Sequence, residues 1–273
     1  MIKNSPLLLL FLLLVSCEKH SFDIINLNND EIQVLGHGGM GIHSLLPMNC
    51  VASVENCLGA GTAGTELDVQ MTKDGVLVAF HDEDLAENTN AVGRIHDLNW
   101  SEIEGTVYSD LLLFSAHELV RIEDLLTEVD DLRDYVLSFD CKLYTDAENS
   151  NDYYEDFSNA ISDLQEQYQL NLYIESQSPE FLALMKQKNP LAKLFYYPET
   201  FEEALELVLD LDLFGISIST EDINAAQVDL AHENGIWVAL WNVHTRERNI
   251  EAIEKNPDII QGDKLNHLLS LLD

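Results

Sequence analysis

The sequence predicts one α/β domain folded as a (β/α)8 barrel, the TIM barrel, over residues 32–273. First, strand-like and helix-like segments alternate along this range, which favours parallel strands joined by crossover helices. Second, most strand-like segments are rich in β-branched or aromatic residues and poor in charges, as expected for strands covered on both faces. Third, the chain has no glycine-rich nucleotide-binding loop. This disfavours a doubly wound open sheet, which the alternating pattern would also allow.

The elements are expected in the following order. Strands are predicted at 32–36, 65–71, 76–81, 135–143, 170–176, 192–197, 213–219, 236–243 and 258–262. Helices are predicted at 178–187, 198–211, 221–235 and 245–256. Ser178 and Pro179 are typical of a helix start. Thr200 and Glu203 have the spacing of a capping box, and Gly235 is a natural helix end.

The N-terminal segment is expected to direct the chain to a membrane and not to join the fold. Lys3 precedes a run of nine apolar residues, 7–15, which is too short to span a bilayer but suits a signal peptide. The run ends in Leu-Val-Ser-Cys, which resembles a bacterial lipobox with Cys17 as the lipidated residue. We therefore expect a signal peptide at 1–16, a lipidated linker at 17–31 and a lipid-anchored protein of the bacterial cell envelope, outside the cytoplasm. An ordinary cleaved signal peptide is the alternative.

The composition excludes several classes of partner. The chain has 49 acidic and 14 basic residues, a net charge of −35. This disfavours nucleic-acid binding and a polybasic membrane patch, so a lipid anchor would be the only membrane contact. An anionic substrate would be repelled at long range and would need a local cation. Cys50, Cys57 and Cys141 are an odd number, which argues against a disulfide framework and predicts buried thiols.

Two pairs of ionisable residues lie inside predicted strands. Glu66 and Asp68 are two residues apart, so both side chains point to the same face of the strand. Two buried carboxylates are costly unless a positive group joins them, and oxygen ligands favour a divalent cation, Ca²⁺ or Mg²⁺. Asp140 and Lys142 have the same spacing, which fits one metal ligand and one phosphate contact, or alternatively a buried structural ion pair.

Several histidines follow predicted strands. His37 ends the strand at 32–36 and precedes glycines at 38, 39 and 41, whose backbone could admit a phosphate. His81 ends a second strand, which returns after a hairpin-like turn at 72–75 in which Gly75 is free to take a positive φ. Barrel enzymes keep their sites at the carboxyl ends of the strands, so both are candidate catalytic groups. His43 and His244 could line the same site, whereas solvent-facing positions are expected for His96, His232 and His267.

The order of these residues resembles the glycerophosphodiester phosphodiesterase family. The residues that carry the resemblance are His37-Gly38-Gly39, Glu55-Asn56, Glu66-Leu67-Asp68-Val69, Thr72-Lys73-Asp74-Gly75, His81-Asp82 and Thr89-Asn90, and more loosely Asp140-Cys141-Lys142, Ser176, Trp241-Asn242-Val243 and Gly262-Asp263. The match is dense over 34–94. It implies a TIM barrel of the phospholipase C-like phosphodiesterase group.

The resemblance also implies an activity, metal-dependent hydrolysis of small glycerophosphodiesters to glycerol 3-phosphate and an alcohol. Glu66, Asp68 and Asp140 would bind the divalent cation, and His37 and His81 would be base and acid. Lys142 would hold a phosphate oxygen, and Trp241 would form an apolar wall for the glycerol part. Two positions depart from the family pattern: Gly38 stands where the family usually has Arg, and Gly262 where it often has Thr.

Three alternative functions stay open at this point. The first is a related barrel phosphodiesterase for another head group, such as a phosphoinositide or a sphingolipid. The second is a catalytically silent lipoprotein that binds a glycerophospho ligand, which the missing Arg suggests. The third is an unrelated metal hydrolase with Zn²⁺ and histidine ligands, which the absence of an HExxH pattern disfavours.

Overall fold

A computed structural model describes residues 21–109, 117–145, 150–190 and 192–273 of the chain. Within these residues, eight parallel strands form a closed barrel, because the first strand pairs with both the second and the last. The predicted TIM barrel is therefore confirmed. The predicted signal peptide, 1–16, and the lipidation site Cys17 lie outside the described residues.

The barrel strands follow one another around the ring in chain order. They are β1 (Gln33–Gly36), β2 (Gly64–Met71), β5 (Val136–Cys141), β6 (Asn171–Ser176), β7 (Lys193–Tyr196), β8 (Gly215–Ser219), β9 (Trp237–Val243) and β10 (Ile259–Gly262). The segment predicted as a strand at 76–81 is not a barrel strand. Its central part, β3 (Leu77–Ala79), pairs antiparallel with β2 because the turn around Gly75 reverses the chain.

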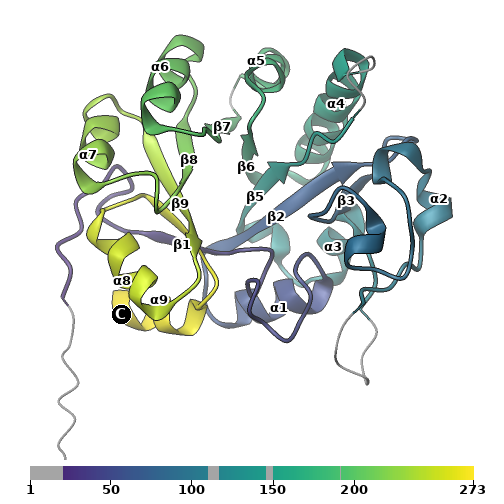
Figure 1. Cartoon of the computed structure of the whole chain (residues 1–273), viewed down its shortest axis with the longest axis horizontal. Coiled ribbons are helices and arrows are strands. Elements are labelled where there is room, and N and C mark those ends of the chain that lie inside the picture. Colours follow the sequence, from purple (N-terminus) through teal and green to yellow (C-terminus); the bar gives the residue numbers. More distant parts are fainter. Residues whose placement is uncertain (1–20, 110–116, 146–149, 191) are drawn as a thin grey trace, which may run out of the picture.

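Helices surround the strands (Figure 1). They are α1 (Val51–Gly59), α2 (Trp100–Ile103), α3 (Ile122–Glu128), α4 (Ser150–Tyr168), α5 (Pro179–Lys188), α6 (Phe201–Leu211), α7 (Ala225–Glu233), α8 (Arg246–Glu254) and α9 (Leu265–Leu272). Ser178 and Thr200 cap α5 and α6 as expected. The capping box at α6 is incomplete, because the Glu203 carboxylate accepts a hydrogen bond from the Tyr196 hydroxyl. In the described part of the chain, none of these helices has the length and apolar character to cross a bilayer.

Successive side chains along each strand point alternately to the helices outside the barrel and to its interior. Leu67 of β2 and Phe139 of β5 point outward into the main core beneath the helices. The alternate side chains point into the barrel. At its amino end they form an apolar layer of Leu35, Val136, Tyr173, Phe195, Ala239 and Ile259. Above that layer, Glu175 accepts hydrogen bonds from Ser138 and Gln261. The register pairs Asp68 with Asp140, and Asp140 with Glu175, so the carboxylates gather at the carboxyl end of the strands.

The amino end of the barrel is closed by aromatic rings and one lysine. The Lys193 ammonium lies 4.7 Å from the Tyr173 ring centroid, 5.4 Å from that of Phe214 and 5.8 Å from that of Trp237. Burial lowers the pKa of this lysine, and the negative faces of the rings offset part of the lost hydration. Access to the buried carboxylates is thus left to the opposite end.

The segment between β2 and β5 forms a satellite beside the barrel. It contains β3, the short strand β4 (Val120–Arg121) and α2, which lie on one side of the barrel in Figure 1. One group of its buried side chains forms a separate cluster, made by Val78, Phe80, Leu85, Ile95, Ile103 and Leu119. The satellite therefore has a small core of its own, while Leu77, Ala79 and Val120 from β3 and β4 pack into the main core.

Three minor expectations have mixed outcomes. Cys50, Cys57 and Cys141 are buried and form no disulfide with one another, as predicted. The solvent-facing positions expected for two histidines are wrong, because the His96 and His232 side chains are only 8% and 11% exposed. His232 is held inside by Asp258, whose Oδ2 lies 3.1 Å from its Nε2.

Candidate active site

Three carboxylates converge at the carboxyl end of β2 and β5. Glu66 and Asp68 are 2% and 1% exposed, and Asp140 joins them from the neighbouring strand. One oxygen from each lies within 4.8 Å of the others, which is a spacing that could hold a metal ion. The period of two residues along a strand explains the convergence, since residues 66, 68 and 140 all point into the barrel.

The charges of this cluster are only partly compensated. Burial and the neighbouring Asp68 raise the pKa of Glu66 well above its ordinary value, and burial likewise raises the pKa of Asp140. Burial acts in the same direction on Asp68, but the charges of Lys142, His81 and His37 outweigh it and lower its pKa. A bound cation would favour the ionised form of all three carboxylates, and these against one ammonium would leave an excess of two negative charges, which suits a divalent cation.

Lys142 lies between two of these acids. Its Nζ is 3.0 Å from Asp68 Oδ1 and 2.6 Å from Asp140 Oδ2. The side chain therefore forms the ion pair with Asp140 that is the alternative to a phosphate contact. Burial lowers the pKa of this ammonium, but Asp140 and Asp68 more than offset burial and raise it well above its ordinary value. Lys142 thus remains a fixed positive charge at the carboxylate cluster.

His37 is held by an acid from the far end of the chain. Its Nδ1 lies 3.1 Å from Oδ1 of Asp263, which directly follows β10, and the same oxygen accepts from the Ile42 amide at 2.9 Å. Asp263 Oδ2 bonds to His244 Nδ1. Burial lowers the His37 pKa, but Asp263, Glu66 and Asp68 outweigh burial and raise it to about 9. In the absence of a bound cation, the imidazolium form is therefore favoured.

The glycines after His37 let the loop pack closely. Gly38 has a φ of +53°, and its N–H donates to Glu66 Oε2 at 2.9 Å. A Cβ at this position would lie 2.6 Å from Met48 Cε and 2.7 Å from Met48 Cβ. Met48 therefore occupies the space into which a side chain at position 38 would project. The same loop carries Asn49, whose Nδ2 donates to Asp68 Oδ2 at 2.7 Å.

His81 follows the satellite strand β3. Its side chain is 53% exposed, and its Nδ1 lies 2.8 Å from Asp82 Oδ1. Asp82 also accepts from Asn88 Nδ2, so this carboxylate is fixed on both oxygens. Gln70 donates to the backbone carbonyls of Phe80 and Asp82 at 2.8 Å each, which ties the segment around His81 to β2. The imidazole is thus oriented although it is open to solvent.

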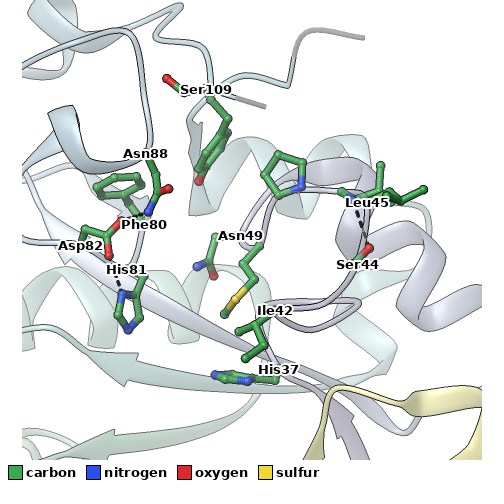
Figure 2. Close-up of a pocket in the computed structure, with 14 residues that line it drawn as sticks. His37, Ile42, Ser44, Leu45, Asn49, Phe80, His81, Asp82, Asn88 and Ser109 are labelled. Atoms are coloured by element: carbon green, nitrogen blue, oxygen red, sulfur yellow. Dashed lines mark hydrogen bonds and ion pairs between the residues drawn. The ribbon is translucent and has the colours of Figure 1, made fainter. Parts of the chain in front are cut away.

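Both imidazoles face one cavity of about 510 Å³ (Figure 2). The cavity lies between the loop after β1 and the satellite. Asn49 lines it and also binds Asp68, so the cavity adjoins the carboxylate cluster. Residues from distant parts of the chain, His37, His81 and the three acids, therefore gather around one opening of the barrel.

Other sequence-derived candidates lie elsewhere. Trp241, at the carboxyl end of β9, packs on Tyr197 with ring centroids 5.0 Å apart and is not among the residues that line the cavity. Its role as a substrate wall stays a prediction. Glu55 and Asn56 are exposed on α1. His43 contacts the His244 ring, with centroids 6.0 Å apart, and neither histidine lines the cavity.

Comparison with known proteins places this arrangement in a family. The model of the glycerophosphoryl diester phosphodiesterase family matches residues 40–266. The chain belongs to the glycerophosphodiester phosphodiesterase family. This family consists of phosphoric diester hydrolases, so the chain is assigned to that class of enzyme.

Two bacterial relatives illustrate the similarity in sequence. A glycerophosphodiester phosphodiesterase of Caldanaerobacter subterraneus subsp. tengcongensis is 25% identical over 236 residues, which cover 83% of this chain and 93% of that protein. A glycerophosphodiester phosphodiesterase of Bacillus altitudinis is 41% identical over 64 residues, or 23% of this chain and 26% of that protein. Hydrolysis of glycerophosphodiesters is the activity that such relatives support.

Solved structures agree on the fold. An Oleispira antarctica phosphodiesterase, in complex with the product sn-glycerol-3-phosphate, superposes with a TM-score of 0.76 at 19% identity, covering 88% of this chain and 96% of that one. A glycerophosphodiester phosphodiesterase of Parabacteroides distasonis gives 0.74 at 19% identity with the same coverage. At such identities the likeness shows the glycerophosphodiester phosphodiesterase fold alone.

Two residues of this family member were not assigned a role from its sequence. Asn49 bridges the loop after β1 to Asp68, and no sequence signal distinguishes it from any other loop asparagine. Asp263, which belongs to the loosely matching part of the family pattern, is the hydrogen-bond partner of His37. His37 and His81 are ionisable residues that directly follow predicted strands. Asp263 has the same position after the predicted strand at 258–262, so the same pattern points to it.

Proposed function

We propose that this chain hydrolyses glycerophosphodiesters to sn-glycerol 3-phosphate and an alcohol, using a divalent cation, Ca²⁺ or Mg²⁺, and two histidines. The observation that carries the proposal is the convergence of three carboxylates, two of them buried, and two imidazoles at one end of the barrel. Glu66, Asp68 and Asp140 would hold the cation. When bound there, it would neutralise charge on the phosphoryl oxygens of an anion that the net charge of −35 otherwise repels.

The protein groups would divide the remaining work. Lys142 would offer its fixed positive charge to a phosphate oxygen, and Trp241 would contact the glycerol part. His37 would take a proton from the nucleophile, either water or a neighbouring substrate hydroxyl, and His81 would give a proton to the departing alcohol. A base must be neutral, so the role of His37 depends on a cation that offsets the carboxylates which now raise its pKa.

The direct test is release of glycerol 3-phosphate from glycerophosphocholine by the full chain, assayed with Ca²⁺ and then with Mg²⁺. We expect stoichiometric release of glycerol 3-phosphate and choline. Tight binding of glycerophosphocholine without any turnover in either metal would refute the catalytic proposal, and would favour the ligand-binding lipoprotein instead. A substrate panel with inositol and sphingolipid head groups tests the related-phosphodiesterase alternative.

Asp263→Asn is expected to lower kcat by about 10- to 100-fold with little change in KM. Asp263 fixes the Nδ1–H form of His37, which leaves Nε2 able to accept a proton. An amide in its place would present an N–H to either His37 or His244. The check combines kinetics with ¹⁵N NMR of the His37 ring, because a merely structural role would not change its tautomer. An unaltered tautomer and an undiminished kcat would contradict this positioning role.

We also propose that Cys17 is lipidated and anchors the chain in the bacterial cell envelope. The lipobox-like sequence before Cys17 supports this proposal. Cys17→Ala should move the protein from the membrane fraction to the soluble fraction and abolish incorporation of labelled palmitate. Unchanged membrane association of the variant would exclude the anchor.

A further inference from the structure

We propose that the cavity beside the two imidazoles binds a hydrocarbon chain, so that the preferred substrates are glycerophosphodiesters carrying an alkyl or acyl chain. This inference rests on the proposed hydrolysis and specifies its substrate class. The chain could be attached to the departing alcohol or to the glycerol, as in a lysophospholipid. The chemistry to be recognised is the same in both cases, and the experiment below separates them.

The cavity wall is largely hydrocarbon. The loop after β1 and the satellite contribute Ile42, Leu45, Leu46, Pro47, Met48 and Phe80. Figure 2 shows Ile42 and Leu45 on one side of the cavity, across from Phe80, with His37 and His81 at its edge. The volume of about 510 Å³ is ordinary for a small-molecule site. A cavity of this kind, in contact with the reacting groups, is suited to the non-reacting part of a substrate.

Most polar groups in the wall already have a hydrogen-bond partner within the protein. The Ser44 hydroxyl accepts from the Leu46 amide, and the Tyr108 hydroxyl donates to the Ala79 carbonyl. Asp82 is used by His81 and Asn88. The side-chain amide of Asn49 both donates to Asp68 and accepts from its backbone N–H. A polar alcohol such as choline or ethanolamine would therefore exchange water for few new hydrogen bonds here, whereas a hydrocarbon chain loses none.

The position beside the reacting groups is also apolar. Met48 fills the space next to Gly38, and a side chain at residue 38 would collide with it at 2.6 Å. A cation that could grip the phosphate is therefore replaced at this point by a flexible thioether, which adapts well to apolar ligands. This arrangement shifts recognition of the substrate from the phosphate towards its hydrocarbon part.

The mouth of the cavity exposes large apolar side chains. Leu45 is 77% exposed and Ile42 is 44% exposed. Single exposed apolar side chains are common, but two in one short loop at the rim of an apolar cavity mark a ligand-binding edge. A bound chain that leaves the cavity would cover them.

The experiment measures kcat/KM for two series of substrates with the full chain and added cation. In the first series, glycerol 3-phosphate is esterified to ethanol, butanol, hexanol or octanol. In the second, glycerophosphoethanol carries an ether-linked chain of the same lengths on the glycerol. Each buried methylene contributes up to about fourfold, so we expect kcat/KM to rise by about 30-fold or more from ethyl to octyl in one series. The series that rises identifies where the chain is attached.

Variants assign the effect to this cavity. Leu46→Gln should reduce the octyl-to-ethyl ratio of kcat/KM by about tenfold. Leu209→Gln, the same change at a 49% exposed position on α6, should leave the ratio as it is. Leu45→Gln serves as a second variant in case Leu46→Gln does not fold. Leu45 is an exposed side chain at the mouth of the cavity, so its replacement should not disturb the core.

The outcomes separate this inference from the proposed function. A ratio near one in both series, with ready hydrolysis of the ethyl esters, would overturn the chain-binding inference and leave the hydrolysis standing. A rising ratio that survives both cavity variants would also overturn it, because the preference would then arise elsewhere. If none of the esters is hydrolysed, the proposed function fails and the inference fails with it.

Discussion

Removal of divalent cations should lower the rate of glycerol 3-phosphate release by about a thousandfold or more, and added Ca²⁺ or Mg²⁺ should restore it. A bound metal contributes several kcal/mol of charge stabilisation in such reactions. Here three carboxylates lie within 4.8 Å of one another, and the Lys142 ammonium is the one lysine charge that pairs with them in the described structure. Without a cation, the carboxylate cluster therefore presents negative charge to the phosphate. The measurement is initial rate against free cation concentration after dialysis with chelator.

Asp68→Asn tests whether the cation is bound at this cluster. The variant keeps the shape of the side chain but removes an anionic ligand, so calorimetric cation affinity should fall by about 100-fold, and the rate with it. Asp222→Asn is the matched control, because Asp222 is an exposed acid in the loop after β8. Full activity in thoroughly chelated protein, or unaltered cation affinity of Asp68→Asn, would exclude the metal proposal.

His81→Ala should reduce kcat by about 10²- to 10⁴-fold, the usual contribution of a general acid or base. The side chain is 53% exposed, so its removal should change the melting temperature little. Loss of activity can then be read as loss of chemistry. His37→Asn should cause a similar loss, and circular dichroism is needed there, because His37 is only 19% exposed and supports the loop through Asp263.

A matched control is available in the same region. His43 is exposed, lies in the loop after β1 and does not line the cavity, so His43→Ala should retain wild-type rates. Near-full turnover by His81→Ala or by folded His37→Asn would reject the assignment of acid and base to these two residues.

The sequence predicts the barrel and the carboxylate cluster well, for a local reason. The alternation of strand side chains puts Glu66 beside Asp68, and Asp140 beside Lys142, and parallel pairing in register then brings the two pairs together. The segment at 76–81 follows from equally local reasoning. Its composition is that of a buried strand, and the hairpin-like turn at 72–75 correctly predicts that it runs back along β2.

Features that depend on contacts between distant segments could not be predicted. Asp263 is 226 residues from His37, and nothing near either residue shows that they meet. The role of Met48 depends on a loop whose path is fixed by Gly38 at a positive φ and by Asn49 bound to Asp68. In the sequence, a loop that contains leucine and methionine resembles ordinary protein surface. Its position beside both imidazoles shows that it lines the cavity.

The satellite between β2 and β5 has a small core of its own beside the opening of the barrel. Phe80 belongs to the small cluster, whereas His37 and the acids belong to the barrel. Over evolutionary time, replacements among the satellite's interior residues can therefore widen, narrow or redirect what the enzyme accepts while the eightfold scaffold stays intact.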